Sequence, residues 1–293
     1  MAEELKRDDN SFTPLPITDR DFRRLVDFIQ GNYGIDLSKK QQLISGRLSY
    51  TIKTKGYSGF GPFIDHLLQA KDPADVEMVI NKLTTNYTFF MREQEHYNFF
   101  RDTILPDIVR RHERERVLSI WSAGCASGEE PYNISMYIKD FLGAEASNWD
   151  ARVLATDISQ QALAKARRGR YTLPDTIPPA WRSRFFRPVN AAEGEYEVAP
   201  EIRNNVIFQT FNLMDPIRFR LKFDVIFCRN VMIYFNQETK DALVARFCAA
   251  TEPGGYLLIG HSETMGKNPG YRYLAPATFQ KRWGSGSLSA ALR

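Results

Sequence analysis

The sequence predicts an α/β protein in which a domain with a mostly parallel β-sheet follows a smaller all-helical domain. Over residues 15–91 apolar residues recur with helical spacing, whereas after residue 117 short apolar runs alternate with helical patterns. A proline-rich stretch at 171–204 interrupts the second pattern and predicts an insertion in the sheet domain. At 293 residues the chain is long enough for each domain to bury its own core.

The composition excludes several classes of protein. A net charge of +4, from 39 Lys and Arg against 35 Asp and Glu, is too small to indicate nucleic-acid binding by itself. The N-terminal residues are charged, and the sequence has no run of about 18 apolar residues that could cross a membrane. Three cysteines without CxxC spacing are typical of reduced thiols, so we expect a cytoplasmic protein. The four histidines lack the spacing of metal ligands, and no metal site is predicted.

Four helices are predicted in the N-terminal domain, after a charged tail of residues 1–14 that we expect to be disordered. Thr18 and Asp21 have the spacing of a capping box and open the first helix. Gly31 and Gly34 are expected to end this helix. The apolar residues of the other three helices lie within 44–52, 60–68 and 76–83.

The second of these helices, predicted over residues 38–55, carries basic residues and no acid. Its basic residues are Lys39, Lys40, Arg47, Lys53 and Lys55. Such a surface attracts an acidic partner by electrostatic steering, and the alternative is an ordinary solvated helix face. Nucleic acid is a poor match, because Tyr50 is the only aromatic residue among the charges.

A linker helix over residues 92–116 is predicted to lead into the sheet domain, which covers residues 117–283. The predicted strands are 117–121, 152–156, 205–210, 223–228 and 255–260, with an edge pair near 271–274 and 277–283. The insertion should contain a hairpin around Gly194. The tail at 284–293 is linker-like, and we expect it to be flexible.

The stretch Leu118–Tyr132 has the pattern of a buried strand, a turn of small residues and the start of a helix. Gly124 in the turn lets the backbone approach a ligand, and Glu129 and Glu130 at the helix start favour a positive amine over a phosphate. Asp157 lies 33 residues after Gly124 and ends the next strand, where a carboxylate can bind the hydroxyls of a ribose. The alternative is a tight strand–helix connection in which Asp157 caps the following helix.

Polar residues also follow three further predicted strands, at Asn212, at Arg229 and Asn230, and at residues 261–263. Because ligands of open α/β sheets bind at the carboxyl ends of strands, we expect these residues to converge on one site. Tyr234 lies one helical turn beyond Asn230 and is expected to face the same site, with ordinary aromatic packing as the alternative.

The segment TTNYTFFMRE, residues 84–93, interleaves polar and aromatic residues where the helical domain is predicted to end. We expect it to line a cleft between the domains, with Arg92 reaching into that cleft. The alternative is that Phe89 and Phe90 form the core of a hinge and that Arg92 is a surface charge.

Six motifs occur in the order TTNYTFFMRE, WSAGCASGEEPYNISM, ATDIS, FNLMD, FCRNVMIYF and GHSE. With this combination the chain resembles the chemotaxis receptor methyltransferases, the CheR family, over about residues 17–283. The resemblance implies a Rossmann-like class I methyltransferase domain with a small antiparallel β-subdomain inserted at 171–204, after an N-terminal helical domain. It also implies transfer of a methyl group from S-adenosyl-L-methionine (SAM) to glutamate side chains of chemoreceptors, with S-adenosyl-L-homocysteine as the product.

The resemblance also implies roles for individual residues. Arg92 and Tyr234 would lie near the transferred methyl group, and the basic helix would dock on the acidic bundle of the receptor. Asp157 would bind the ribose, and Glu130 would bind the amino group of the methionine part. The full set of expected cofactor contacts, with the glycine turn included, is Asn86, Thr88, Arg92, Gly124, Glu130, Asp157, Asn212, Leu213, Arg229 and Asn230.

Two alternatives to this function remain open. One is a signalling adaptor that binds the cofactor without turnover, and the other is a methyltransferase of small molecules. Residues 185–194 lack the glycine-rich turn of those family members that hold a receptor's C-terminal peptide, so such a second receptor contact also stays open. We expect a monomer that inserts no segment into the membrane.

Overall fold

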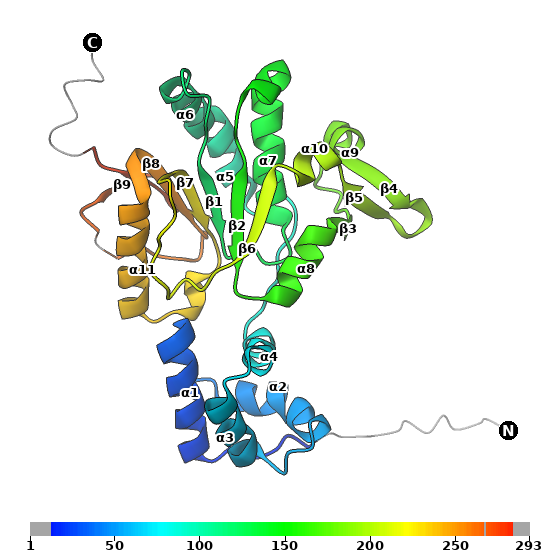
Figure 1. Ribbon diagram of the computed structural model, residues 1–293, viewed down its shortest axis with the longest axis vertical. Coiled ribbons are helices and arrows are strands. Elements are labelled where there is room, and N and C mark those ends of the chain that lie inside the picture. Colours follow the sequence, from blue (N-terminus) through cyan, green and yellow to red (C-terminus); the bar gives the residue numbers. More distant parts are fainter. Residues whose placement is uncertain (1–12, 267, 284–293) are drawn as a thin grey trace. The chain divides into compact units, whose positions relative to one another are not determined.

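The computed structural model describes residues 13–266 and 268–283, which form two compact units (Figure 1). Within these residues the first unit comprises 13–31 and 36–84, and the second comprises 32–35 and everything from Thr85 onward. The predicted domain boundary at residue 91 therefore falls inside the second unit. The predicted tails, 1–14 and 284–293, lie almost entirely outside the described residues.

The first unit is built from helices α1 (Asp19–Tyr33), α2 (Gln41–Thr54), α3 (Phe60–Ala70) and α4 (Pro73–Leu83). The hydroxyl of Thr18 accepts a hydrogen bond from the N–H of Asp21, which is one half of the predicted capping box, but the Asp21 carboxylate accepts from the Thr18 hydroxyl and not from its backbone N–H. However, α1 continues through Gly31 and ends at Tyr33, because a glycine inside a helix costs only about 1 kcal/mol. Gly34, with a φ of 74°, is the glycine that ends it.

Helix α2 is three residues shorter at its start than the predicted helix 38–55, and three of the predicted docking residues have structural contacts. Lys53 donates to the carbonyl oxygen of Thr13 at 3.4 Å. Arg47 donates to the carbonyl oxygens of Lys82 and Thr84 at the end of α4, at 3.1 and 3.3 Å. Lys55 forms an ion pair of 2.7 Å with Asp75. By contrast, the side chains at positions 39 and 40 are exposed just before the first residue of α2.

The second unit contains a seven-stranded sheet with the strand order β6-β2-β1-β7-β8-β10-β9. Its strands are β1 (Ile120–Ala123), β2 (Val153–Asp157), β6 (Val206–Thr210), β7 (Phe223–Cys228), β8 (Thr251–Ile259), β9 (Tyr271–Ala275) and β10 (Thr278–Lys281). The first five are parallel to one another, and β10 is antiparallel to both β8 and β9. From β1 the chain proceeds outward to β2 and β6 and then returns to β7 on the other side of β1. This reversal makes the carboxyl ends of β1, β2 and β7 the expected ligand site.

The predicted strands are found, with two shifts in position: β8 begins at Thr251, four residues before its predicted start, and β1 is displaced at both ends. Strand β1 runs to Ala123, whereas the sequence predicts its end at residue 121. Ser122 and Ala123 are small residues typical of a turn, but both are buried and pair with β2. Val117 forms only an isolated bridge, with Asp150. The α/β fold class is confirmed.

Helices connect these strands and precede them. The predicted linker helix is a run of three segments, α5 (Gln94–Phe99), the π-helix η1 (Phe100–Ile104) and α6 (Leu105–Arg111). Pro106, which cannot donate a backbone hydrogen bond, lies two residues beyond the π-helical turn, in the first turn of α6. Helices α7 (Glu129–Leu142) and α8 (Gln160–Arg168) pack on β2 and β6, and α11 (Gln237–Ala250) packs on β8.

The insertion forms a small antiparallel sheet of its own, with the order β3-β5-β4, apart from the large sheet (Figure 1). Its strands are β3 (Arg170–Thr172), β4 (Phe186–Asn190) and β5 (Glu195–Val198), accompanied by α9 (Pro179–Phe185) and α10 (Pro200–Arg203). Strands β4 and β5 form the predicted hairpin, and Gly194 lies in its turn with a φ of 67°. In the described part of the chain, no helix has both the length and the apolar character needed to cross a lipid bilayer.

Candidate functional site

The turn after β1 consists of small residues, so backbone atoms and not long side chains lie at the carboxyl end of this central strand. Gly124 has a φ of 85°, and a Cβ at this position would collide with Cγ2 of Val231, which follows β7. Gly128 has a φ of 97°, and a Cβ there would lie 2.7 Å from Cβ of Ala166 on α8. Both positions therefore require glycine, the first for close approach at the strand ends and the second for helix packing.

Asp157, the last residue of β2, holds this turn in place. Its Oδ2 accepts a hydrogen bond of 2.8 Å from the N–H of Ala126, and its Oδ1 accepts one of 2.9 Å from the N–H of Ser159. The cap of α8 is Ser159, whose hydroxyl accepts from the N–H of Ala162. Helix capping by Asp157, the alternative explanation for this residue, is therefore wrong. Its carboxylate stands at the carboxyl end of β2.

The two acids that open α7 have different environments. Glu129 accepts a hydrogen bond of 2.7 Å from the Ser127 hydroxyl, and burial raises the pKa of Glu129. Glu130 accepts from the Ser122 hydroxyl at 2.8 Å and from Nη1 of Arg229 at 3.0 Å. Glu130 is thus the acid that links β1 to the end of β7.

Arg229 is the most connected side chain of the site, and it is only 2% exposed. Its guanidinium binds carboxylate oxygens of Glu130 and Glu93 at 3.0 and 3.1 Å. It also donates to the hydroxyl of Tyr97 at 3.2 Å and to the backbone carbonyl of Arg92. Burial alone would lower the pKa of Arg229, but Tyr97 and the two carboxylates raise it, so the guanidinium stays charged. Burial also raises the pKa of Tyr97 to about 12, which keeps its hydroxyl neutral.

Glu93 was not expected in the site. Besides Arg229, it accepts hydrogen bonds on Oε1 from Nδ2 of Asn230 at 3.2 Å and from the N–H of His261 at 3.3 Å. Burial would raise the pKa of Glu93, but its contacts with His96, Arg229 and Asn230 together lower it, so it is a carboxylate. The motif MRE contains this acid directly after Arg92, which is the only sequence signal that points to it.

Glu93, His96 and His261 bring potential metal ligands within 4.8 Å of one another. Nδ1 of His96 lies 3.3 Å from Oε2 of Glu93, although the pair is not aligned as a hydrogen bond. The chain separates the two histidines, so their spacing in the sequence could not reveal this cluster. A cation at this position would compete with Arg229 for the same carboxylate, because the charge of Glu93 is already compensated.

Tyr234 and Arg92 belong to one local arrangement around the segment 85–93. The hydroxyl of Tyr234 donates to the carbonyl oxygen of Thr85 at 3.1 Å and accepts from the N–H of Thr85 at 3.2 Å. Arg92 donates to the carbonyl oxygen of Tyr87 at 2.8 Å and lies over the ring of Phe89. Because this segment belongs to the second unit from Thr85 onward, it joins the strand ends from within the sheet unit and not from the helical one.

Four other expected cofactor contacts lie on the same segment or on the loop after β6. Asn86 is exposed and Thr88 is half-buried. The side chain of Asn212 donates to the carbonyl oxygen of Asn32 at 2.8 Å and accepts from the N–H of Met214, which fixes its orientation. Leu213 is buried. No contact described above joins these four positions to Arg229.

The end of β8 supplies a structural carboxylate. Glu263 is buried and accepts hydrogen bonds from the N–H groups of Asn230, Gly260 and Ile233, at 3.0, 2.6 and 3.1 Å. Burial raises the pKa of Glu263 even though these donors lower it. Its lone pairs are directed at backbone, so Glu263 shapes the loop that follows β7 instead of facing a ligand.

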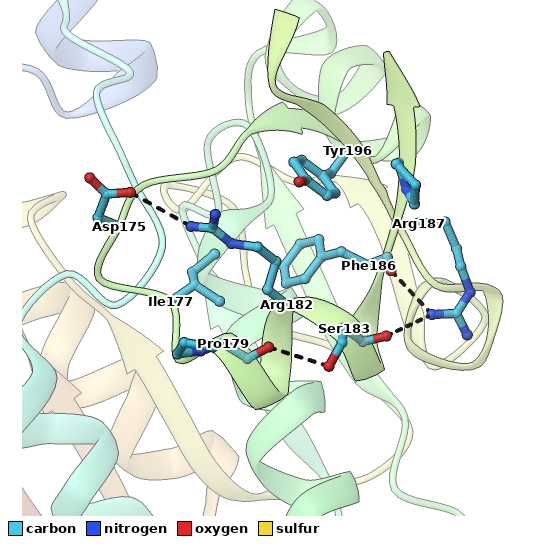
Figure 2. A pocket seen from close by; sticks show the side chains of 9 residues that line it. Asp175, Ile177, Pro179, Arg182, Ser183, Phe186, Arg187 and Tyr196 are labelled. Carbon is cyan, nitrogen blue, oxygen red and sulfur yellow. Dashed lines mark hydrogen bonds and ion pairs between the residues drawn. The ribbon is translucent and has the colours of Figure 1, made fainter. Parts of the chain in front are cut away.

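A separate pocket of about 750 Å³ lies in the inserted subdomain (Figure 2). Arg182 and Tyr196 lie on one side of it, and the guanidinium of Arg182 is 3.8 Å from Asp175. Arg187 on the other side donates to the carbonyl oxygens of Ser183 and Phe186. None of the expected site residues lines this pocket.

Comparison with known proteins fits the division into two units. The profile of the CheR methyltransferase SAM binding domain matches residues 86–280, and that of the CheR methyltransferase all-alpha domain matches residues 20–84. The chain belongs to the CheR methyltransferase family. As in other members, a SAM-binding methyltransferase domain follows an all-helical domain, and SAM is the cofactor.

Chemotaxis protein methyltransferases of several bacteria are similar to this CheR family member over most of their length. The protein of Borreliella burgdorferi is 38% identical over 271 residues, which cover 90% of this chain and 95% of that protein. The protein of Escherichia coli is 36% identical over 256 residues, 86% of each chain. Chemotaxis protein methyltransferase 1 of Pseudomonas aeruginosa is 34% identical over 255 residues, 85% of this chain and 92% of that protein.

Proposed function

We propose that this protein transfers a methyl group from SAM to glutamate side chains in the cytoplasmic region of chemoreceptors, giving glutamate γ-methyl esters. The observation that carries the proposal is the convergence of Gly124, Glu130, Asp157 and Arg229 on the carboxyl ends of β1, β2 and β7, in a chain of the CheR family. The family membership supports methylation in chemotaxis. That the methyl group goes to a glutamate oxygen is the more specific part of the proposal, which the family membership alone does not state.

The residues at this edge fit SAM. The glycine turn leaves room for backbone to approach a ligand, and the two carboxylates suit an ammonium group and a ribose. Asp157 would bind the ribose hydroxyls, Glu130 the amino group, and Asn212 and Leu213 the adenine side. The remaining contacts would come from Asn86, Thr88, Arg92, Arg229 and Asn230. When bound, SAM supplies an electrophilic methyl group on a sulfonium.

Methylation of a glutamate needs no general base, because the carboxylate is already ionised near pH 7, its reference pKa being about 4.3. A carboxylate oxygen forms the new O–C bond while the C–S bond breaks, and the sulfur keeps the electron pair. The protein has to align the reacting atoms and exclude water, an effect worth up to about 7–11 kcal/mol. Arg92 would orient the incoming carboxylate, and Tyr234 would hold the segment that carries Arg92 through its two hydrogen bonds with Thr85.

The roles of Arg92 and Tyr234 can be tested with Arg92→Ala and Tyr234→Phe. The first variant removes the charge that orients the acceptor, and the second removes only the hydroxyl that binds Thr85. We expect kcat/KM on receptor-containing membranes to fall more than about tenfold in each, a loss of about 1.4 kcal/mol of transition-state stabilisation. Wild-type kcat/KM in both variants would show that these residues have no such role.

The partner and location follow from the same proposal. The exposed basic residues that precede α2 would steer the protein to the acidic helical bundle of a receptor in the cytoplasm, at the chemoreceptor arrays. We propose a monomer. A C-terminal peptide of the receptor, if the inserted subdomain binds one, would have the pocket of Figure 2 as its binding site.

One experiment separates the proposal from its alternatives. The protein is incubated with methyl-labelled SAM and receptor-containing membranes, and the membranes are then treated with base. Glutamate esters release labelled methanol, whereas a non-catalytic adaptor gives no label and a small-molecule methyltransferase leaves the membranes unlabelled. Incorporation of label that resists base would refute the assignment to a carboxylate.

A further inference from the structure

We propose that Glu93 is a positioning residue for methyl transfer, which fixes Arg229 and, through it, the backbone of Arg92 and the carboxylate of Glu130. This inference rests on the function proposed above, because Glu93 would act on catalysis only through the roles proposed there for Arg92 and Glu130. Glu93 is not one of the expected cofactor contacts, and 14% of its side chain is exposed.

The contacts of Glu93 join three segments that are far apart in the chain. Oε2 binds Nε and Nη2 of Arg229 at 3.3 and 3.1 Å, across 136 positions of sequence. Oε1 binds the side chain of Asn230 and the N–H of His261, the residues that follow β7 and β8. One carboxylate thus ties the loops after two neighbouring strands to the segment that carries Arg92.

Arg229 transmits this position to both halves of the expected site. Its Nη2 donates to the carbonyl oxygen of Arg92, on the acceptor side, while its Nη1 binds Glu130, on the cofactor side. The guanidinium is planar and rigid, so its orientation sets the distance between the two. Without Glu93, a buried arginine would keep Glu130 as its only carboxylate partner and would be free to rotate toward it.

Backbone conformations in this arrangement are ones that non-glycine residues rarely adopt. Met91, Glu93 and Asn230 are not glycines, yet they have φ values of 64°, 55° and 60°. For Met91 and Glu93 such left-handed conformations are unfavourable and persist only where the surroundings hold them, whereas asparagine adopts them more readily. Arg92 lies between two of these residues, and the hydrogen bond between Glu93 and Asn230 joins the second to the third.

Glutamine cannot replace this carboxylate, because both oxygens face donors. With its NH₂ group on the side of Oε2, a glutamine would oppose the guanidinium of Arg229. With the group turned around, it would oppose Nδ2 of Asn230 and the N–H of His261. Aspartate keeps the charge but is shorter by one methylene, so it cannot reach both sets of donors.

The test compares Glu93→Gln and Glu93→Asp with Glu95→Gln, an equal change of charge at an exposed neighbour on α5. Calorimetry measures the affinity for S-adenosyl-L-homocysteine, and kcat and KM for receptor membranes are measured with saturating SAM, well below the melting temperature of each variant. We expect both Glu93 variants to lose at least tenfold in kcat per folded molecule, and Glu95→Gln to stay within about twofold of wild type. A purely structural role would lower the melting temperature and leave kcat unchanged.

Two outcomes would overturn the inference. One is a Glu93→Gln variant with the kcat of Glu95→Gln. The other, if Glu93→Gln does not fold, is a folded Glu93→Asp variant with wild-type kcat. Arg92→Ala, measured in parallel, separates this failure from that of the proposed function. If Arg92→Ala loses activity while the Glu93 variants keep it, only the positioning role is refuted, whereas activity in all of them refutes the function assigned to Arg92 as well.

Discussion

Replacement of Asp157 by alanine is the sharpest test of where the cofactor binds. The carboxylate oxygens of Asp157 accept the backbone N–H groups of Ala126 and Ser159 at the end of β2, and the proposed function has the same carboxylate bind both ribose hydroxyls. Hydrogen bonds to a charged group are worth about 1.5–3 kcal/mol each, so the loss of two amounts to about 3–6 kcal/mol. At about 1.4 kcal/mol for each factor of ten, the affinity for S-adenosyl-L-homocysteine should fall more than about 100-fold.

The assay is isothermal titration calorimetry, with far-UV circular dichroism to confirm that the variant is folded. Ser159→Ala is the matched control, because it removes the cap of α8 two residues away but leaves the N–H that Asp157 binds. This control should cost about 1 kcal/mol of stability and leave cofactor affinity within about twofold. Unchanged affinity in folded Asp157→Ala would refute the ribose role. An equal loss of cofactor affinity in Ser159→Ala would show that the conformation of the loop after β2, and not the Asp157 carboxylate, determines this affinity.

Three other predictions concern the turn, the docking surface and pH. Gly124→Ala adds a Cβ where there is no room at a positive φ, so cofactor affinity should fall at least tenfold, whereas Gly46→Ala, in open space on α2, should leave binding unchanged. Replacement of Lys39 and Lys40 by glutamate should slow receptor methylation at low salt but should not weaken cofactor binding. The Debye length is about 3 Å near 1 M salt, so an equally large defect in methylation rate at that salt concentration would contradict electrostatic steering. The pKa of Glu93 is lower in the folded state than in the unfolded state, so its ionised carboxylate stabilises the fold above about pH 4.5. This stabilisation is lost as the pH falls below that value. The free energy of unfolding, measured with urea at pH 7 and at pH 3.5, should therefore change less between the two pH values for Glu93→Gln than for wild type.

The sheet could be predicted from the sequence because its central strands are buried on both faces. Such strands appear as continuous apolar runs, and FDVIFC in β7 is buried at every position. The end of β1 could not be placed in this way, because Ser122 and Ala123 have the composition of a turn. Their burial depends on β2 and β7 on either side, which local sequence does not contain.

The candidate site was predictable at the strand ends and hidden elsewhere. Glycine, Asp157 and Arg229 follow apolar runs, so the rule for open α/β sheets brings them to one edge. Glu93 follows no strand, and its partners Arg229 and His261 lie 136 and 168 positions away. Only the folded chain shows that an acid next to Arg92 organises the end of β7.

The two acids at the start of α7, which first suggested an amine-bearing ligand, are separated by their partners. Glu129 accepts from the Ser127 hydroxyl, and burial raises the pKa of its carboxyl group. Glu130 shares a buried guanidinium with Glu93, and these three groups together carry one net negative charge. A single positive group from a ligand would neutralise that charge, and the helix N-terminus stabilises the carboxylate until then. The expected preference of this site for an amine would therefore depend on the whole Glu93–Arg229–Glu130 arrangement and not on one acid at the helix start.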